Sequence, residues 1–242
     1  MKKRTRIILS VCLAVLLLFG IGGYAYVSDY YHADETALEA MAYQTDSVQA
    51  ELDGNVTWFV PENRVAGLIF YPGGKVENTA YAPLMRACAE NGILCALVRM
   101  PGNLAVLDAN AADGLQQKYP EITTWYIAGH SLGGAMAANY AAAHAEDYDG
   151  LILLAAYSTK DISQTSLRVL SVYGSEDGVM DRESYEKNRA NLPADTNAVV
   201  LVGGCHAQFG SYGPQDGDGI PTISGEEQVR QTAEAIVAFI GQ

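Results

Sequence analysis

The chain has 242 residues, of which 49% are apolar and 18% are charged, and its formal net charge is −13. This length and apolar content are sufficient for one domain with a sizeable core. An acidic chain repels the phosphates of nucleic acids and of anionic lipid headgroups, so the composition argues against a nucleic-acid partner.

Residues 1–27 differ in character from the rest of the chain. Four basic residues precede an uncharged apolar run over residues 7–27, a pattern shared by secretory signal peptides and uncleaved signal anchors. A helix of about 20 apolar residues spans a bilayer, and Tyr24 and Tyr26 stand where a cleavage site would need small residues. We therefore expect an N-terminal transmembrane anchor, with the rest of the chain outside the cytoplasm. If the segment is cleaved, we expect a secreted protein.

The remainder of the chain is strongly acidic and contains three cysteines. Because the four basic residues lie in the first segment and no acidic residue does, residues 28–242 carry a formal charge of −17, which we interpret as keeping an exported domain soluble. Cys88 and Cys95 lie in apolar stretches and are expected in the core, whereas the position of Cys205 beside His206 leaves a thiol or redox role open. The cysteines lack metal-ligand spacing, and we expect no metal and no organic cofactor.

Residues 28–46 are polar and tyrosine-rich, and they predict a linker, with a short helical pattern, that leads to a domain over residues 47–242. The predicted strands of this domain cover residues 48–52, 56–60, 65–71, 93–98, 123–128, 151–155, 168–173 and 198–202. The predicted helices cover residues 80–91, 105–118, 135–144, 184–191 and 226–240. Such alternation is typical of an α/β fold with a mostly parallel eight-stranded sheet covered by helices on both faces. The first two strands are joined by a turn signal and should form an antiparallel edge.

Residues 129–134 read GHSLGG and lie between a predicted strand and an alanine-rich predicted helix. A G-x-S-x-G sequence in this place is typical of a nucleophile elbow, a turn so tight that the serine takes strained backbone angles. Ser131 is the predicted nucleophile, and Gly129 and Gly133 are the neighbours that must lack a Cβ. Such a turn raises the serine hydroxyl above the sheet and directs the first amides of the helix at the atom attacked.

A serine nucleophile needs a base within hydrogen-bond reach and a carboxylate that orients this base. His206 follows the last predicted strand, at the end where open α/β sheets place their sites. Asp177 and Glu176 leave the seventh predicted strand in a glycine-containing turn, and we prefer Asp177 because its shorter side chain holds an imidazole more rigidly. Asp181 is a weaker candidate. The order Ser131, Asp177, His206 is the one that this architecture uses.

Acyl transfer also requires hydrogen-bond donors for the oxygen that becomes negative. The backbone amide of Leu132, at the start of the helix, is predicted as one donor of this oxyanion hole. The second is predicted in the loop after the third strand, which reads YPGGK, with Gly74 preferred and Lys75 as the alternative. Glycine lets this backbone approach a substrate closely.

A long loop follows the predicted base. Residues 208–221 contain Asp216 and Asp218 between glycines, which could suggest a calcium site. Because the loop offers fewer oxygen ligands than such a site needs, we predict a solvated loop beside His206.

These motifs resemble those of the alpha/beta-hydrolase superfamily, in its small lid-less branch called alpha/beta-hydrolase fold 5. The resemblance covers residues 48–242 and rests on YPGG at 71–74, GHSLGG at 129–134, YGSEDG at 173–178 and GGCHAQFG at 203–210. It implies the fold and the triad but no substrate, since esterases, lipases, thioesterases, acyltransferases and some peptidases share these motifs. Larger relatives insert a cap between the sixth and seventh strands. Here only residues 156–167 fill that gap, so we expect a shallow, open site.

We therefore expect a serine hydrolase that cleaves carboxylic esters of small or exposed acyl groups through an acyl-enzyme, with a small-molecule ester as its substrate. Two alternatives stay open. One is a transacylase or peptidase that acts on cell-envelope material, and the other is a catalytically idle scaffold that binds envelope ligands.

Overall fold

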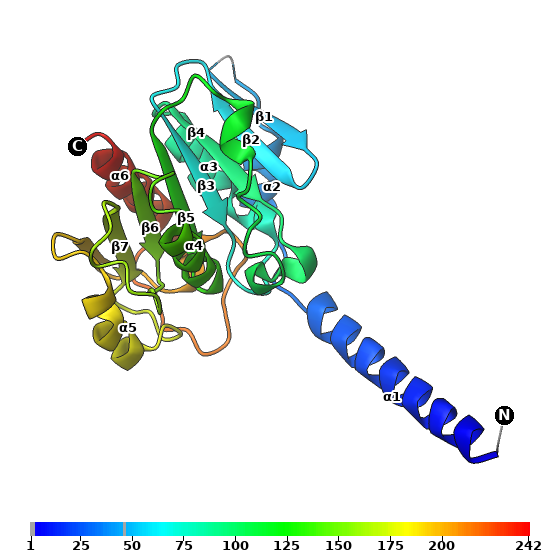
Figure 1. Cartoon of the computed structure of the whole chain (residues 1–242). Coiled ribbons are helices and arrows are strands. Elements are labelled where there is room, and N and C mark those ends of the chain that lie inside the picture. Colours follow the sequence, from blue (N-terminus) through cyan, green and yellow to red (C-terminus); the bar gives the residue numbers. More distant parts are fainter. Residues whose placement is uncertain (1–2, 46) are drawn as a thin grey trace. The chain divides into compact units, whose positions relative to one another are not determined.

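The structure is a computed structural model that describes residues 3–45 and 47–242, and the side chains from residue 12 onward within them. Residues 1, 2 and 46, which belong to the predicted anchor and linker, lie outside the described residues. The chain forms one unit that ends at Tyr30 and a second unit, Tyr31–Gln242 (Figure 1).

The first unit contains the helix α1 (Lys3–Ser28). A helix is therefore present where the apolar run predicts one. In the part of the chain that the structure describes, however, no helix has both the length and the apolar character needed to traverse a bilayer. The predicted transmembrane anchor is thus not supported.

An eight-stranded sheet runs through the second unit in the order β1-β2-β4-β3-β5-β6-β7-β8. The strands are β1 (Val48–Asp53), β2 (Val56–Pro61), β3 (Ala66–Tyr71), β4 (Ile93–Val98), β5 (Trp125–His130), β6 (Gly150–Leu154), β7 (Arg168–Gly174) and β8 (Asn197–Leu201). β2 pairs antiparallel with β1 and with β4, and the other neighbouring strands are parallel. The predicted mostly parallel sheet with an antiparallel edge is confirmed.

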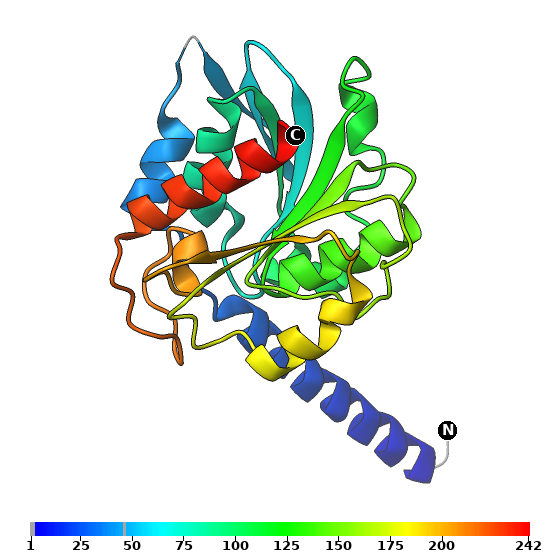
Figure 2. The same cartoon turned by 90° about the vertical axis from the view of Figure 1, so that its left-hand side faces the viewer.

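Helices cover both faces of this sheet. They are α2 (Glu35–Ala42), α3 (Ala82–Ala89), α4 (Leu132–Ala143), α5 (Arg182–Asn188) and α6 (Gly225–Ile240). Successive strand residues face opposite sides, so Leu68 and Phe70 of β3 pack in a core with α3 and α6, whereas Ile69 and Tyr71 pack in a core with α4. Figure 2 shows α3 and α6 together on one face and α4 across the sheet. Burial on both faces explains why the central strands are continuous apolar runs.

The helix predicted over residues 105–118 is wrong. Two short 3₁₀ helices and the turns between them occupy this stretch, η3 (Ala105–Leu107) and η4 (Leu115–Lys118). The Tyr71 hydroxyl donates a hydrogen bond to the Ala109 carbonyl at 3.0 Å and accepts one from the Ala112 N–H at 2.9 Å. The Ala109 carbonyl and the Ala112 N–H therefore bond to a side chain instead of forming the hydrogen bonds of an α-helix. Gly114 also takes the left-handed φ of 75°, which interrupts a helix.

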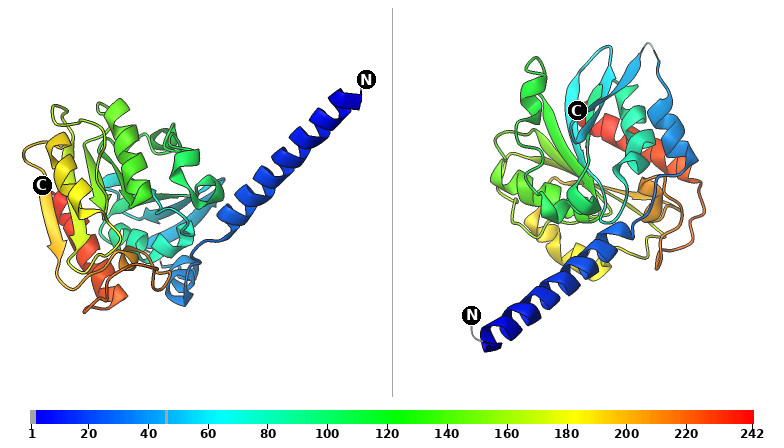
Figure 3. Two further views of the ribbon diagram at one scale, coloured as in Figure 1. Left: turned by 90° about the horizontal axis from the view of Figure 1, so that it is seen from below. Right: turned by 90° about the vertical axis from the view of Figure 1, so that its right-hand side faces the viewer.

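Part of the predicted linker over residues 28–46 belongs to the second unit. α2 packs beside α3 on the face that also carries α6 (Figure 3), and its Ala37 is fully buried. The Tyr31 N–H donates to the Lys75 carbonyl at 2.7 Å, and the Tyr31 carbonyl accepts the Glu77 N–H at 2.9 Å. This segment therefore pairs with the loop that follows β3, which is the loop predicted to supply an oxyanion donor.

Candidate active site

Ser131 occupies a tight turn between β5 and α4. Its φ and ψ are 52° and −122°, a sparsely populated combination that costs about 1–3 kcal/mol. A Cβ at Gly129 would lie 2.5 Å from the backbone carbon of Gly133. A Cβ at Gly133 would in turn overlap the carbonyl oxygens of Tyr71 and Pro72. Both neighbours must therefore be glycine, which is the geometry expected of a nucleophile elbow.

The structure brings Asp177 and His206 together in a buried pair. They follow β7 and β8, and because these strands are parallel neighbours, their carboxyl ends lie at the same edge of the sheet. His206 Nδ1 lies 2.9 Å from Asp177 Oδ2, and the two side chains are 2% and 0% exposed. Asp177 Oδ1 accepts the N–H groups of Val179 and Met180 at 2.9 and 2.8 Å. Because a carboxylate only accepts, Nδ1 of His206 carries the hydrogen, and Nε2 can accept a proton.

The other two acidic candidates make different contacts. Glu176 is exposed and accepts the hydroxyl of Ser175 at 2.8 Å. Asp181 caps α5 by accepting the hydroxyl and the N–H of Ser184 at 2.6 and 3.0 Å, and these hydrogen bonds lower the pKa of its carboxyl. Of the three acids, Asp177 is the one that the structure pairs with His206.

The His206 ring packs against the ring of His130, the residue that directly precedes Ser131. The ring centroids of His130 and His206 are 4.5 Å apart. Among the hydrogen bonds of the described residues, none joins the Ser131 hydroxyl to His206. Such contacts are often long in enzymes without substrate and shorten when substrate binds. The structure thus gathers the three predicted residues at one edge of the sheet, with the contact between acid and histidine already formed.

The two predicted oxyanion donors are adjacent. A Cβ at Gly74 would lie 2.8 Å from Cδ2 of Leu132, so the loop after β3 closes on the first turn of α4. Neither the Gly74 N–H nor the Leu132 N–H has an acceptor among the described residues. The Lys75 N–H, in contrast, donates to the Asn103 carbonyl at 2.8 Å. Gly74 therefore fits the second donor better than Lys75 does.

A buried hydrogen-bond network behind the elbow has no counterpart in any sequence motif. The Gly73 N–H donates to the Tyr81 hydroxyl at 3.0 Å, and this hydroxyl lies 2.8 Å from Nδ1 of His130. The tautomer of His130 sets which of the two atoms donates in this hydrogen bond. Burial, and then the neighbouring His206, hold the pKa of His130 well below its ordinary value, so this imidazole is neutral. The network connects the oxyanion loop to the ring that packs against the predicted base.

The loop after His206 is exposed at residues 213, 214, 216, 217 and 220, as the prediction of a solvated loop requires, but the prediction is wrong for Asp218. The Asp218 carboxylate accepts four backbone hydrogen bonds. Oδ1 accepts the N–H groups of Gly178, His206 and Gly219 at 3.1, 3.1 and 2.8 Å, and Oδ2 accepts that of Ala207 at 2.8 Å. Asp216, in the same loop, is exposed as expected. An aspartate between glycines carries no sequence signal that distinguishes these two situations.

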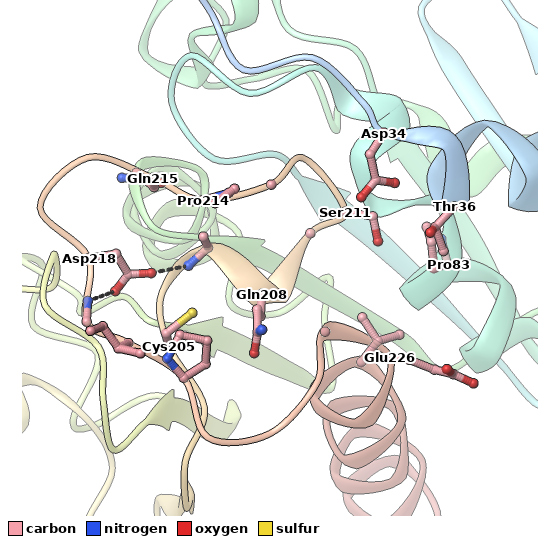
Figure 4. A pocket seen from close by; sticks show the side chains of 18 residues that line it. Asp34, Thr36, Pro83, Cys205, Gln208, Ser211, Pro214, Gln215, Asp218 and Glu226 are labelled. Atoms are coloured by element: carbon pink, nitrogen blue, oxygen red, sulfur yellow. Dashed lines mark hydrogen bonds between the residues drawn. The ribbon is translucent and has the colours of Figure 1, made fainter.

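A cavity of about 640 Å³ lies behind this loop, between the first turns of α2, α3 and α6 (Figure 4). Asp34, Gln208, Asp218 and Glu226 are among its lining residues. Ser131 does not line it, so this cavity is separate from the candidate active site.

Burial argues against a thiol role at Cys205. Cys205 is 3% exposed, and burial raises the pKa of its thiol to about 11. The thiol is therefore protonated near neutral pH and is a poor nucleophile. Cys88 and Cys95 are buried in the core, as predicted.

The connection between β6 and β7 is short. Residues 155–167 are all described and form turns and loop without a helix or strand. No cap is inserted at this point of the chain, and the carboxyl edge of the sheet is left uncovered by one.

Comparison with known proteins places the chain in a family. A model of the alpha/beta hydrolase family matches residues 67–230, which is more than half of the chain. No curated protein matches the sequence.

Solved structures share the fold at low sequence identity. They include Est1E from Butyrivibrio proteoclasticus, with 16% identity, 81% of this chain and 100% of that chain covered, and a TM-score of 0.59. A membrane phospholipase A described as a bacterial virulence factor has 14% identity, 98% of each chain covered and a TM-score of 0.60. Dienelactone hydrolase from Anabaena variabilis has 13% identity, coverage of 81% and 98%, and a TM-score of 0.59. With the family match and this fold, the chain belongs to the alpha/beta hydrolase family.

Proposed function

We propose that the chain is a serine hydrolase that cleaves carboxylic esters of small or exposed acyl groups through an acyl-enzyme. Ser131 is the nucleophile, His206 the general base and then acid, and Asp177 the group that orients His206. The amides of Leu132 and Gly74 form the oxyanion hole. The observation that carries the proposal is the buried 2.9 Å contact between His206 and Asp177, which lies at the sheet edge that also holds the strained serine.

Acylation follows from these positions. Nε2 of His206 takes the proton of the Ser131 hydroxyl as its oxygen attacks the ester carbonyl. The carbonyl oxygen becomes negative and accepts hydrogen bonds from the two amides, which have no acceptor to give up within the described part of the chain. His206 then donates its proton to the departing alcohol, leaving the acyl group on Ser131.

Deacylation repeats these steps with water. His206 removes a proton from the water that attacks the acyl-enzyme, and it returns this proton to Ser131 when the carboxylic acid leaves. Asp177 stabilises the imidazolium in both halves of the reaction. Its second oxygen is fixed by two backbone N–H groups, so the carboxylate cannot turn away from His206 without breaking them.

The substrate class is inferred from the uncapped sheet edge. A short loop over residues 155–167 provides no tunnel for a long acyl chain, so small acyl groups, or acyl groups exposed on a larger molecule, fit best. Dienelactone hydrolase and a phospholipase A are among the structural neighbours, and their names are consistent with ester hydrolysis in general.

The proposal is tested with the full chain on p-nitrophenyl esters from acetate to dodecanoate, together with fluorophosphonate labelling. We expect turnover that is highest for short acyl chains, and labelling that is lost in Ser131→Ala. Ser166→Ala, which changes an exposed serine in the loop before β7, is the control and should behave as the unaltered chain.

The same experiment separates the alternatives. Acyl transfer to an added alcohol or amine in preference to water would identify a transacylase. Folded protein that neither turns over any ester nor reacts with the probe would contradict the proposal and favour a binding scaffold.

A further inference from the structure

Asp218 lies in the loop after His206, and its carboxylate joins three separate pieces of backbone. One is the turn that carries Asp177, through the N–H of Gly178. Another is the start of the loop that carries His206, through the N–H groups of His206 and Ala207. The last is its own turn, through Gly219. The carboxylate therefore contacts both strand ends that supply the acid and the base.

We infer that Asp218 is a positioning residue, which holds the Asp177 turn and the His206 loop in one frame and thereby fixes the hydrogen bond between these two side chains. The inference rests on the proposed function and goes beyond it, because Asp218 touches neither the substrate nor the reacting atoms.

The turn that carries Asp177 and the loop that contains Asp218 approach each other closely at this carboxylate. A Cβ at Gly219 would overlap the carbonyl oxygen of Glu176, and a Cβ at Gly178 would lie 2.7 Å from the carbonyl oxygen of Gly217. Two glycine-containing turns can approach this closely only because they lack side chains there. The N–H groups of Gly178 and Gly219 lie at this close approach, and the Asp218 carboxylate accepts both.

The charge of Asp218 suits this arrangement. Burial opposes ionisation, but the N–H groups of Ala207, Gly178 and His206 outweigh it and lower the pKa of the carboxyl. Hydrogen bonds to an ionised acceptor are about twice as strong as neutral ones. Figure 4 shows the bonds to Ala207 and Gly219 as dashed lines, with the cavity beside them. The carboxylate thus stays charged and fully occupied by backbone donors.

Asparagine is the informative replacement because it keeps the size of the side chain. Its amide has one acceptor oxygen and one NH₂ group. If the oxygen takes the place of Oδ1, the NH₂ group faces the Ala207 N–H. In the opposite orientation it faces the three N–H groups of the other side. In the first orientation the Ala207 N–H loses its acceptor, and in the second the Asp177 turn loses its contact through the Gly178 N–H.

The test compares Asp218→Asn with Asp216→Asn in the full chain, using a p-nitrophenyl ester. Both variants change an aspartate of the same loop and remove the same charge, but the Asp216 carboxyl is exposed. Misplacement of a catalytic group by about 1 Å can cost 100-fold in rate. We therefore expect kcat to fall 10- to 100-fold in Asp218→Asn with KM changed less than threefold, and both constants to stay unchanged in Asp216→Asn.

Two spectroscopic measurements test the inference without relying on activity. In NMR of the full chain, the amides of Gly178, His206, Ala207 and Gly219 should exchange slowly with solvent, and they should exchange faster in Asp218→Asn only. The Nδ1 proton of His206, held by Asp177, should give a resonance that persists in Asp216→Asn and broadens in Asp218→Asn. If the asparagine variant does not fold, the exchange rates of the unaltered chain still test the inference. Rapid exchange of these four amides would show that the Asp218 carboxylate does not hold them.

Unchanged kcat in Asp218→Asn, or equal amide protection in the two variants, would overturn the inference. A chain that turns over no ester but shows the expected exchange pattern would instead contradict the proposed function and leave the positioning of the pair by Asp218 in place.

Discussion

The Tyr81 hydroxyl offers the sharpest test of how the oxyanion loop is held. Tyr81→Phe removes one oxygen from a fully buried ring and leaves the ring itself in place. That oxygen accepts the Gly73 N–H at 3.0 Å and lies 2.8 Å from Nδ1 of His130. The substitution therefore leaves the Gly73 N–H and Nδ1 of His130 without this partner in the protein interior.

The cost follows from these two groups. A buried polar group that loses its partner costs about 1–3 kcal/mol, so the free energy of unfolding should fall by about 2–6 kcal/mol. The activity should fall as well, because Gly73 directly precedes Gly74. Loss of one oxyanion donor costs about 10²- to 10³-fold in kcat, and a displaced donor should cost up to about 10²-fold.

Urea unfolding and ester turnover measure the two effects on one preparation. Tyr185→Phe is the matched control, since its hydroxyl contacts the buried hydroxyl of Ser171 at 3.0 Å and neither group belongs to the site. It should be destabilising by about 1–3 kcal/mol with unchanged kcat. A Tyr81→Phe variant as stable and active as the unaltered chain would refute the reasoning, as would a Tyr185→Phe variant with an equal loss of kcat.

Three further predictions concern the elbow and its histidines. His130 is neutral in the folded chain because its pKa lies well below 6.5, whereas in the unfolded chain it binds a proton as the pH falls below that value. Acidification from pH 7.5 to 5.5 should therefore destabilise the unaltered chain by up to about 1.4 kcal/mol more than His130→Asn, as urea unfolding at both pH values will show. Gly129→Ala sets a methyl group against the backbone of Gly133 and should abolish probe labelling. Gly225→Ala is the control and should label normally, because its methyl group would meet only Cγ of Gln208, at the ordinary contact distance of 3.9 Å. Asp177→Asn should keep the fold by circular dichroism but reduce kcat about 10⁴-fold, since an amide orients the wrong tautomer of the histidine; a loss below tenfold would exclude the assigned role.

The sheet could be predicted from the sequence because its central strands are buried on both faces. Short continuous apolar runs such as Ala66–Tyr71 and Ile93–Val98 are typical of strands that are buried on both faces. The elbow could be predicted because a strained turn restricts its residues to a recognisable pattern. The location of the chain relative to a membrane stays a prediction from the basic and apolar pattern of residues 1–27.

Other features depend on contacts between distant residues, which no local pattern reveals. The composition of residues 105–118 favours a helix, and the Tyr71 hydroxyl overrides it from β3. Tyr81 and Asp218 look like ordinary core and loop residues in the sequence. Their roles come from hydrogen bonds that span 49 residues, to His130, and 40 residues, to Gly178.

The central claim is that Ser131 carries the acyl group, and mass spectrometry of the trapped intermediate tests it most directly. The full chain is mixed with a short p-nitrophenyl ester, quenched in acid and digested. We expect the mass of the acyl group on the peptide that contains Ser131, and its absence in Ser131→Ala. An acyl group found on another residue, or an unmodified Ser131 peptide during active turnover, would contradict the account.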